Sequence, residues 1–189
     1  MLIHPEIAES QEMSDGNVKA QHMMVELKAR VNDLASFRSR LNQLKAEAIG
    51  VFHQIDTYYV VPEGRLKLRE IVGEADAELI YYEREDIPAP KRSSVFILRI
   101  PQPHAFKRII AKVLKVRVIV DKVREVFRYE GVQIHLDKVD SLGYFIEFER
   151  ITSANSEQQK DDISKIERLI SQLNIAPRDL VELSYSDLT

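Results

Sequence analysis

The sequence predicts an α+β fold in which eight antiparallel strands close into a β-barrel flanked by helices. Three observations lead to this prediction. Apolar and polar residues alternate with a period of two in many short segments, tight-turn residues separate most of these segments, and only two or three segments have helical periodicity. Short connections favour antiparallel pairing, and closure into a barrel is one way such a sheet removes its edges.

The first half of the chain supplies five of the predicted strands. Residues 23–31 alternate, with Val25 and Leu27 on one side and Glu26 and Lys28 on the other. The following segments are rich in β-branched and aromatic residues, and they are bounded by Pro and Gly turns such as 62–64 and 73–76. These predicted strands cover residues 52–61, 65–72, 77–84 and 94–100.

The second half adds three strands, at residues 116–129, 132–139 and 144–151, which are separated by turns at Gly131 and at 141–143. Helices are expected where the apolar period changes to about 3.6 residues. The first runs to about Ala48, with Asp33 as its N-cap and an apolar stripe of Leu34, Phe37, Leu41 and Leu44. The others cover residues 105–115, 157–173 with Ser153 or Ser156 as cap, and a short terminal helix from Pro177.

Length and composition favour one soluble domain. The chain has 189 residues, a formal net charge of -3 and no Cys, so disulfides and thiolate metal sites are excluded. No apolar run approaches the roughly 20 residues that span a bilayer, and the acidic start does not resemble a signal peptide. We therefore expect a cytoplasmic protein with an N-terminal extension at residues 1–21 and one domain at 22–189, without membrane or nucleic-acid partners.

Charged residues occupy one face of several predicted strands. In residues 65–69, three cations alternate with two leucines, and residues 26–30 and 122–124 repeat this alternation. Residues 133–137 and 145–149 instead place carboxylates and other polar groups on one face. For any single strand, the simplest interpretation is a half-buried sheet with its polar face in water. Together, the strands predict a barrel lumen with a basic wall and an acidic wall.

Such a lumen favours particular contents. Buried like charges repel in a medium of low dielectric constant, so inward-facing cations require an anion, and a triphosphate is a suitable one. Arg and Lys bind phosphate oxygens, and carboxylates hold Mg²⁺ or Mn²⁺. The sequence contains no Gly-rich phosphate loop and no His spacing typical of zinc sites. The pattern therefore indicates a metal–triphosphate site.

The chain resembles the CYTH superfamily, the triphosphate tunnel metalloenzymes, and within it the class IV adenylyl cyclase-like group. The resemblance covers about residues 23–189. It is carried by the order and spacing of weak motifs, at residues 25–30, 53–59, 64–70, 79–84, 90–93, 122–124, 135–137, 142–149 and 184–188. It implies a domain that binds a triphosphate with Mg²⁺ or Mn²⁺ in a β-barrel tunnel.

The resemblance also implies residue roles. The expected phosphate-binding residues are Lys28, Arg30, Arg65, Lys67, Arg69, Arg84, Arg92, Lys122 and Arg124. Among them, Arg30 is included because it lies on the charged face of its strand. The expected metal ligands are Glu26, Asp137, Glu147 and Glu149. The chain departs from the family pattern at Met24, which stands where the first Glu of the ExExK motif is expected. A thioether is a poor ligand for Mg²⁺.

Three functions are compared. An adenylyl cyclase-like enzyme would convert ATP to cyclic AMP and pyrophosphate, whereas a triphosphatase would hydrolyse thiamine triphosphate, inorganic triphosphate or a nucleoside triphosphate. A non-catalytic binding module is the third function, and Met24 favours it. The sequence identifies no general base, and it leaves open whether a second copy of the chain is a partner. A groove that binds RNA would instead require exposed cations. His53 and His135 are expected to be ordinary polar-face histidines.

Overall fold

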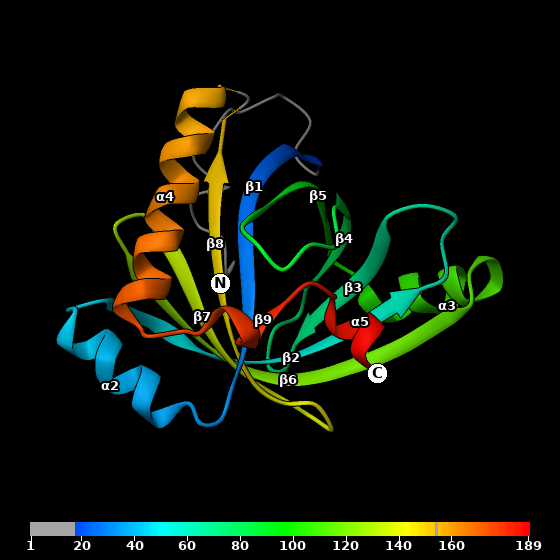
Figure 1. Cartoon of the computed structure of the whole chain (residues 1–189). Coiled ribbons are helices and arrows are strands. Elements are labelled where there is room, and N and C mark those ends of the chain that lie inside the picture. The colour runs from blue at the N-terminus through cyan, green and yellow to red at the C-terminus, as the bar shows by residue number, and fades with distance from the viewer. Residues whose placement is uncertain (1–17, 154) are drawn as a thin grey trace.

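The computed structural model describes residues 18–153 and 155–189. Within these ranges the chain forms one sheet of nine strands, with α2 (Ala35–Gln43), α3 (Pro103–Val113) and α4 (Ser156–Gln172) outside it (Figure 1). The strands are β1 (Val18–Val31), β2 (Glu47–Tyr59), β3 (Arg65–Ile71), β4 (Ala77–Arg84), β5 (Lys91–Ile100), β6 (Val116–Tyr129), β7 (Val132–Val139), β8 (Gly143–Thr152) and β9 (Leu180–Val181). The remaining helices of these ranges are α5 (Tyr185–Leu188) and the 3₁₀ helix η1 (Pro177–Asp179).

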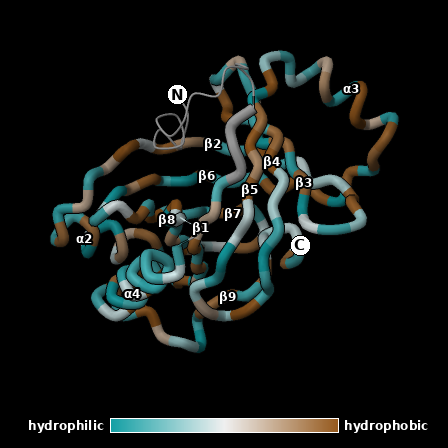
Figure 2. The backbone as a smooth tube through the Cα atoms, turned by 90° about the horizontal axis from the view of Figure 1, so that it is seen from above, coloured by the Kyte–Doolittle hydropathy of each residue, from teal (hydrophilic) through white to brown (hydrophobic). Residues whose placement is uncertain are grey.

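Eight of these strands close into the predicted antiparallel barrel. Their order is β5-β4-β3-β2-β6-β7-β8-β1, and β5 also pairs with β1, which completes the ring. The short strand β9 pairs with β1 at Lys28 and Ala29, just beyond the last residue of β1 that pairs with β5, Glu26. Seen from above, the strands surround a central region, with α2 and α4 on one side and α3 on the other (Figure 2).

The alternation of each strand divides its side chains between two environments. Outward-facing apolar residues pack beneath the helices. On one side Leu27, Ile134 and Phe148 lie in a core with Leu41 of α2 and Leu169 of α4. On the other side α3 covers a smaller cluster on β2 to β5. The inward-facing residues are a mixture of apolar and charged side chains, so the main hydrophobic core lies outside the barrel.

Several element boundaries differ from the prediction. The first helix ends at Gln43 rather than near Ala48 because Lys45 has a left-handed backbone (φ 59°), and β2 starts soon afterwards. The N-cap is Leu34 and not the predicted Asp33, which lies one residue earlier and accepts a hydrogen bond from the amide of Ser36 at 2.7 Å. The long helix α4 is capped by Asn155, whose side chain accepts from Glu157, and not by Ser153 or Ser156.

The described part of the N-terminal region is already part of the barrel. Strand β1 starts at Val18, before the predicted start at Met23. The predicted extension at residues 1–21 otherwise lies outside the described residues. Among the helices of the described ranges, none combines the length and the apolar character needed to cross a bilayer.

Candidate functional site

The inward faces of the strands line a cavity inside the barrel. Most of the predicted site residues meet there: Glu26, Lys28, Lys67, Arg69, Arg84, Lys122, Arg124, Glu147 and Glu149 all line it. They come from β1, β3, β4, β6 and β8, because residues two apart on a strand share a face. The basic and acidic faces predicted from separate strands are therefore brought together.

Four predicted residues do not line the cavity. Asp137 is fully buried behind the wall, where both its oxygens accept hydrogen bonds from Arg124, at 2.8 and 2.6 Å. Arg65 is half-buried and bonds to Asp86 and Asp187. The expectation that Arg30 faces the lumen is corrected, because its side chain is exposed and donates to the carbonyl of Leu142 at 2.6 Å.

Arg92 is also corrected, and its neighbour on β5 takes the inward position. Arg92 is exposed and lies opposite Val25, which belongs to the outer core. Lys91 is buried, with its Nζ 2.6 Å from the carbonyl oxygen of Glu182. A shift of one residue moves a side chain to the opposite face of a strand. The sequence contains both cations, but only the register with β1 decides which one faces inward.

Asp56 of β2 lies at the centre of the basic wall. It is fully buried and contacts three cations: Arg69 at 2.8 Å, Lys67 at 3.0 Å and Lys122 at 2.7 Å. Burial alone would raise the pKa of Asp56, but the three cations outweigh it and hold the pKa well below its usual value. Part of the positive charge that the sequence assigns to a bound anion is therefore already balanced by this carboxylate.

Two buried lysines of the barrel, Lys122 and Lys91, have lowered pKa values. Burial lowers the pKa of Lys122 to about 7, because the attraction of Asp56 only partly offsets desolvation and the neighbouring arginines. Burial and the adjacent Arg84 lower the pKa of Lys91 to about 8. Both groups are therefore balanced between charged and neutral forms close to neutral pH. An anion in the cavity would favour their protonated forms.

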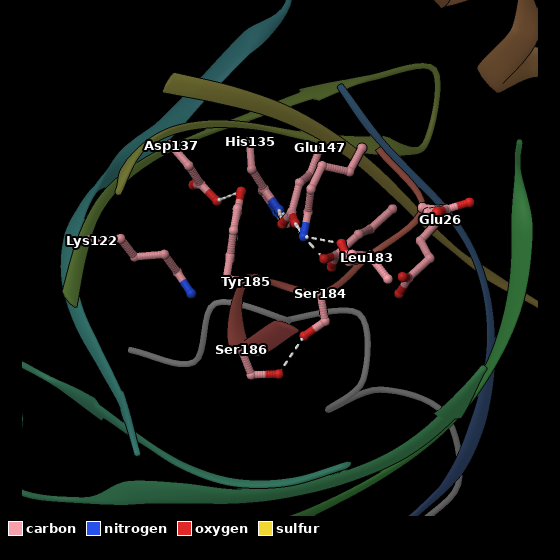
Figure 3. Close-up of polar contacts among 12 residues, drawn as sticks. Glu26, Lys122, His135, Asp137, Glu147, Leu183, Ser184, Tyr185 and Ser186 are labelled. Carbon is pink, nitrogen blue, oxygen red and sulfur yellow. Dashed lines mark hydrogen bonds and ion pairs between the residues drawn. The ribbon is translucent and has the colours of Figure 1, made fainter. Parts of the chain in front are cut away.

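The acidic wall is centred on Glu147 and Glu149 of β8. Glu147 lies 3.0 Å from Lys28 Nζ and also accepts a hydrogen bond from Arg124. Burial opposes ionisation of Glu147, yet Lys28 and Arg124 keep its pKa well below the usual value. His135 of β7 lies behind these carboxylates, with its Nδ1 atom 3.9 Å from Glu147 and 3.6 Å from Glu149 (Figure 3).

Arg84 extends from β4 towards the acidic residues of β1. One of its terminal nitrogens donates to Glu26, and its side chain is only 4% exposed. Its Nε and Nη2 atoms are buried without a hydrogen-bond partner among the described residues. An unpaired buried donor is costly, and more so when it is charged. These two N–H groups are therefore suited to bind an anionic oxygen inside the cavity.

The C-terminal segment, residues 182–187, closes one side of the site. Tyr185 packs against the Lys28 ammonium, which lies 3.6 Å from its ring centroid, and donates its hydroxyl to Asp137 at 2.8 Å. Ser184 and Tyr185 line the cavity, as Figure 3 shows from inside the barrel. Asp187 pairs with Arg65 and with Arg117. Side chains from distant parts of the sequence thus hold this segment against the barrel.

The cavity is small and has a mixed lining. Its volume for the centres of water-sized molecules is about 80 Å³. One water needs roughly 10–15 Å³ on such a measure, so the space holds a few waters. Apolar residues line another part of the wall, among them Met24, Ile80 and Val95. A larger ligand therefore has to displace some of the internal ion pairs or the C-terminal segment.

Sequence reasoning underestimated three groups. Asp56 and Lys91 were not among the predicted site residues, and His135 was expected to be an ordinary polar-face histidine. For Lys91 the sequence shows only that it shares a strand face with Ser93 and Val95, because residues two apart point the same way. That this face is the inward one is known only from the structure. For Asp56 and His135, no signal within the sequence shows that their neighbours from other strands are charged.

Comparisons with known proteins agree with this geometry. The sequence profile of the CYTH domain matches residues 22–185. A candidate adenylate cyclase of Methanocaldococcus jannaschii is 23% identical over 173 residues, which cover 87% of this chain and 97% of that protein. A conserved protein of Pyrococcus furiosus, of hypothetical function, has a TM-score of 0.77 at 23% identity, covering 88% and 99% of the two chains.

A more distant structure comes from the plant Hippeastrum. It is described as a candidate adenylyl cyclase with a dominant triphosphatase activity. Its TM-score with this chain is 0.57 at 15% identity, and the match covers 88% of this chain and 93% of that one. At these identities the structural similarities establish the fold, and the profile match establishes the family.

Proposed function

The chain belongs to the CYTH domain family, and from this premise we propose that it is a metal-dependent enzyme that acts on a triphosphate inside the barrel. The proposed reaction is class IV adenylyl cyclase-like, from ATP to cyclic AMP and pyrophosphate. Hydrolysis of a nucleoside triphosphate, thiamine triphosphate or inorganic triphosphate is the second candidate. The names of the Methanocaldococcus and Hippeastrum proteins support these two candidates.

The observation that carries the proposal is the convergence of both charge types on one cavity inside the barrel. Lys28, Arg84, Lys122 and Arg124 face it together with Glu26, Glu147 and Glu149. An RNA-binding groove requires exposed cations, whereas Lys28, Lys122 and Arg124 of this cavity are each at most 3% exposed. A buried site with fixed cations is suited to a compact, highly charged anion.

The proposed roles follow the two walls. Lys28, Lys67, Arg69, Arg84, Lys91, Lys122 and Arg124 would bind phosphate oxygens, and Arg65 would act at the mouth of the cavity. The carboxylates of Glu147 and Glu149, with Glu26, would hold Mg²⁺ or Mn²⁺. When bound, the ion would neutralise charge on the phosphoryl group. The arginines would orient the chain of phosphates by bidentate contacts, and the closed barrel would exclude bulk water.

The groups proposed for the anion and for the metal are paired with each other inside the barrel. Lys28 and Arg124 contact Glu147, and Arg84 contacts Glu26. A triphosphate that takes these cations leaves the carboxylates available for the metal, and a metal on the carboxylates releases the cations. Binding of the two ligands should therefore be mutually favourable, because coupling between two sites is reciprocal.

The apolar part of the wall favours a nucleotide over inorganic triphosphate. Met24, Ile80, Val95 and Ile97 line the same cavity as the cations. Burying a base or another ring against them would contribute about 25 cal/mol per Å² of apolar surface. Inorganic triphosphate offers no such surface. This observation supports a triphosphate that carries a ring, and it therefore supports the cyclase-like reaction over hydrolysis of inorganic triphosphate.

A turnover assay tests the proposal. The full chain is incubated with Mg²⁺ or Mn²⁺ and, in turn, ATP, thiamine triphosphate and inorganic triphosphate, and the products are separated by chromatography. Cyclic AMP with pyrophosphate supports the cyclase, and release of phosphate alone supports the triphosphatase. Tight binding without product at any metal concentration would show a binding module, for which Met24 is the sequence argument. Absence of both binding and turnover would refute the proposal.

A further inference from the structure

His135 is the feature of the site that neither the predicted ligands nor the family match explains. It lies on β7 and its side chain is fully buried. Gln133 Oε1 lies 3.3 Å from its Nε2 atom. This contact favours the tautomer with the ring proton on Nε2, since the amide oxygen can only accept. The lone pair of the imidazole is then on Nδ1.

That Nδ1 atom has no hydrogen-bond partner among the described residues. It faces the carboxylates of Glu147 and Glu149, at 3.9 and 3.6 Å. These distances are too long for hydrogen bonds from a protonated ring. A lone pair directed at two carboxylates is repelled unless a cation lies between them. The buried, unpartnered nitrogen is therefore an observation separate from the acidic cluster itself.

The distances fit a shared metal ion. One ligand atom from each of His135, Glu147 and Glu149 lies within 4.8 Å of the other two. Around an ion with bonds of about 2.1 Å, adjacent octahedral ligands are about 3.0 Å apart and opposite ones about 4.2 Å. A small inward movement of the three side chains would therefore complete the geometry. The Nε2 contact to Gln133 would orient the ring, as outer hydrogen bonds do at histidine metal ligands.

The other predicted acidic ligands already accept hydrogen bonds from arginines. Both oxygens of Asp137 accept from Arg124, and one of them also accepts from Tyr185. Glu26 accepts from Arg84. Met24 lines the cavity, and a thioether is a poor ligand for Mg²⁺. An imidazole nitrogen suits first-row transition ions better than Mg²⁺, which prefers oxygen ligands.

We propose that His135 Nδ1, with one carboxylate oxygen each from Glu147 and Glu149, forms a divalent metal site that selects Mn²⁺ and other first-row transition ions over Mg²⁺. This inference rests on the proposed function, because Lys28 and Arg124 must leave Glu147 for an anion before the ion enters. It replaces Asp137 as a ligand with His135, and it predicts a metal preference that an all-oxygen site would not have.

The test uses the full chain loaded with Mn²⁺ in the presence of inorganic triphosphate. Pulsed electron paramagnetic resonance detects the ¹⁴N modulation of a nitrogen bound directly to Mn²⁺, and carboxylates give none. We expect this modulation in the wild type and in H53Q, and we expect H135Q to lose it. Titration calorimetry should show Mn²⁺ affinity at least about tenfold weaker in H135Q, with the Mg²⁺ affinity changed much less.

His53 is the matched control, because its imidazole is exposed and pairs with Asp121 at 2.8 Å, away from the acidic wall. Mn²⁺ that binds wild type without ¹⁴N modulation would overturn the role of His135 and leave the proposed function standing. Modulation that persists in H135Q would overturn it as well. Failure of Mn²⁺ and Mg²⁺ to bind with triphosphate would overturn both proposals. Should H135Q not fold, the ¹⁴N modulation of the wild type and its Mn²⁺-to-Mg²⁺ affinity ratio still decide whether a nitrogen ligand selects the metal.

Discussion

Asp56 offers a sharp test of the electrostatics inside the barrel. Its carboxylate contacts Arg69, Lys67 and Lys122 and is fully buried. The substitution D56N keeps the shape but removes the charge, which leaves three neighbouring buried cations without their shared anion. Removing one partner of a buried ion pair costs about 3–5 kcal/mol. Loss of the proton from Lys122, whose pKa is already about 7, would relieve part of this cost.

The expected result has two opposite parts. For a domain of this size, each kcal/mol shifts the melting temperature by about 2–4 °C, so D56N should melt about 6–20 °C lower than the wild type. Inorganic triphosphate should stabilise D56N more than the wild type, because the anion then replaces the missing negative charge.

The same reasoning predicts a pH dependence of the stability. The pKa of Asp56 lies below its unfolded value of about 3.9, so its contribution is present above that pH and is lost as the pH falls further.

The assay is thermal unfolding of the full chain at pH 7.5, with and without inorganic triphosphate. D121N is the matched control, because Asp121 is exposed on β6 and contacts His53, so its loss should change stability by no more than about 0.5 kcal/mol. An unchanged melting temperature for D56N would refute the view that Asp56 balances the buried cations. An equal shift by triphosphate in wild type and D56N would refute the view that the anion binds beside it.

Three other outcomes are expected. Because the pKa of Lys122 is lowered to about 7, the wild type should bind inorganic triphosphate about tenfold more tightly than K122M at pH 6. Calorimetric titrations in which this difference in affinity did not shrink by pH 9 would contradict the prediction. R84A should weaken triphosphate binding by about ten- to a hundredfold, because a buried charged donor is lost. R92A changes an exposed position and should bind like the wild type. Equal effects of the two substitutions would refute the placement of Arg84 in the binding cavity. Y185F should lower the free energy of unfolding in urea by about 1.5–3 kcal/mol, because Asp137 loses a buried hydrogen bond, and an unchanged midpoint would contradict the tethering of the C-terminal segment.

The sequence by itself determined the strands and their two faces. The alternation in residues 65–69 requires that Lys67 and Arg69 share a face opposite Leu66 and Leu68, because the pleat directs successive side chains to opposite sides. Strands β4, β6 and β7 have the predicted bounds for the same reason. The motifs also indicated the family before any coordinates, since each requires only residue type and spacing.

Tertiary structure alone decided what each charged face meets. Lys91 and Arg92 are adjacent cations, and only the pairing of β5 with β1 turns Lys91 inward. Asp56 lies 66 residues from Lys122, and His135 reaches the acidic wall only through the register of β7 with β8. Alternation is a local property of the backbone. The electrostatic field at a side chain is the sum of contributions from charges on strands that are far apart in the chain. These charges come close together only after the barrel closes.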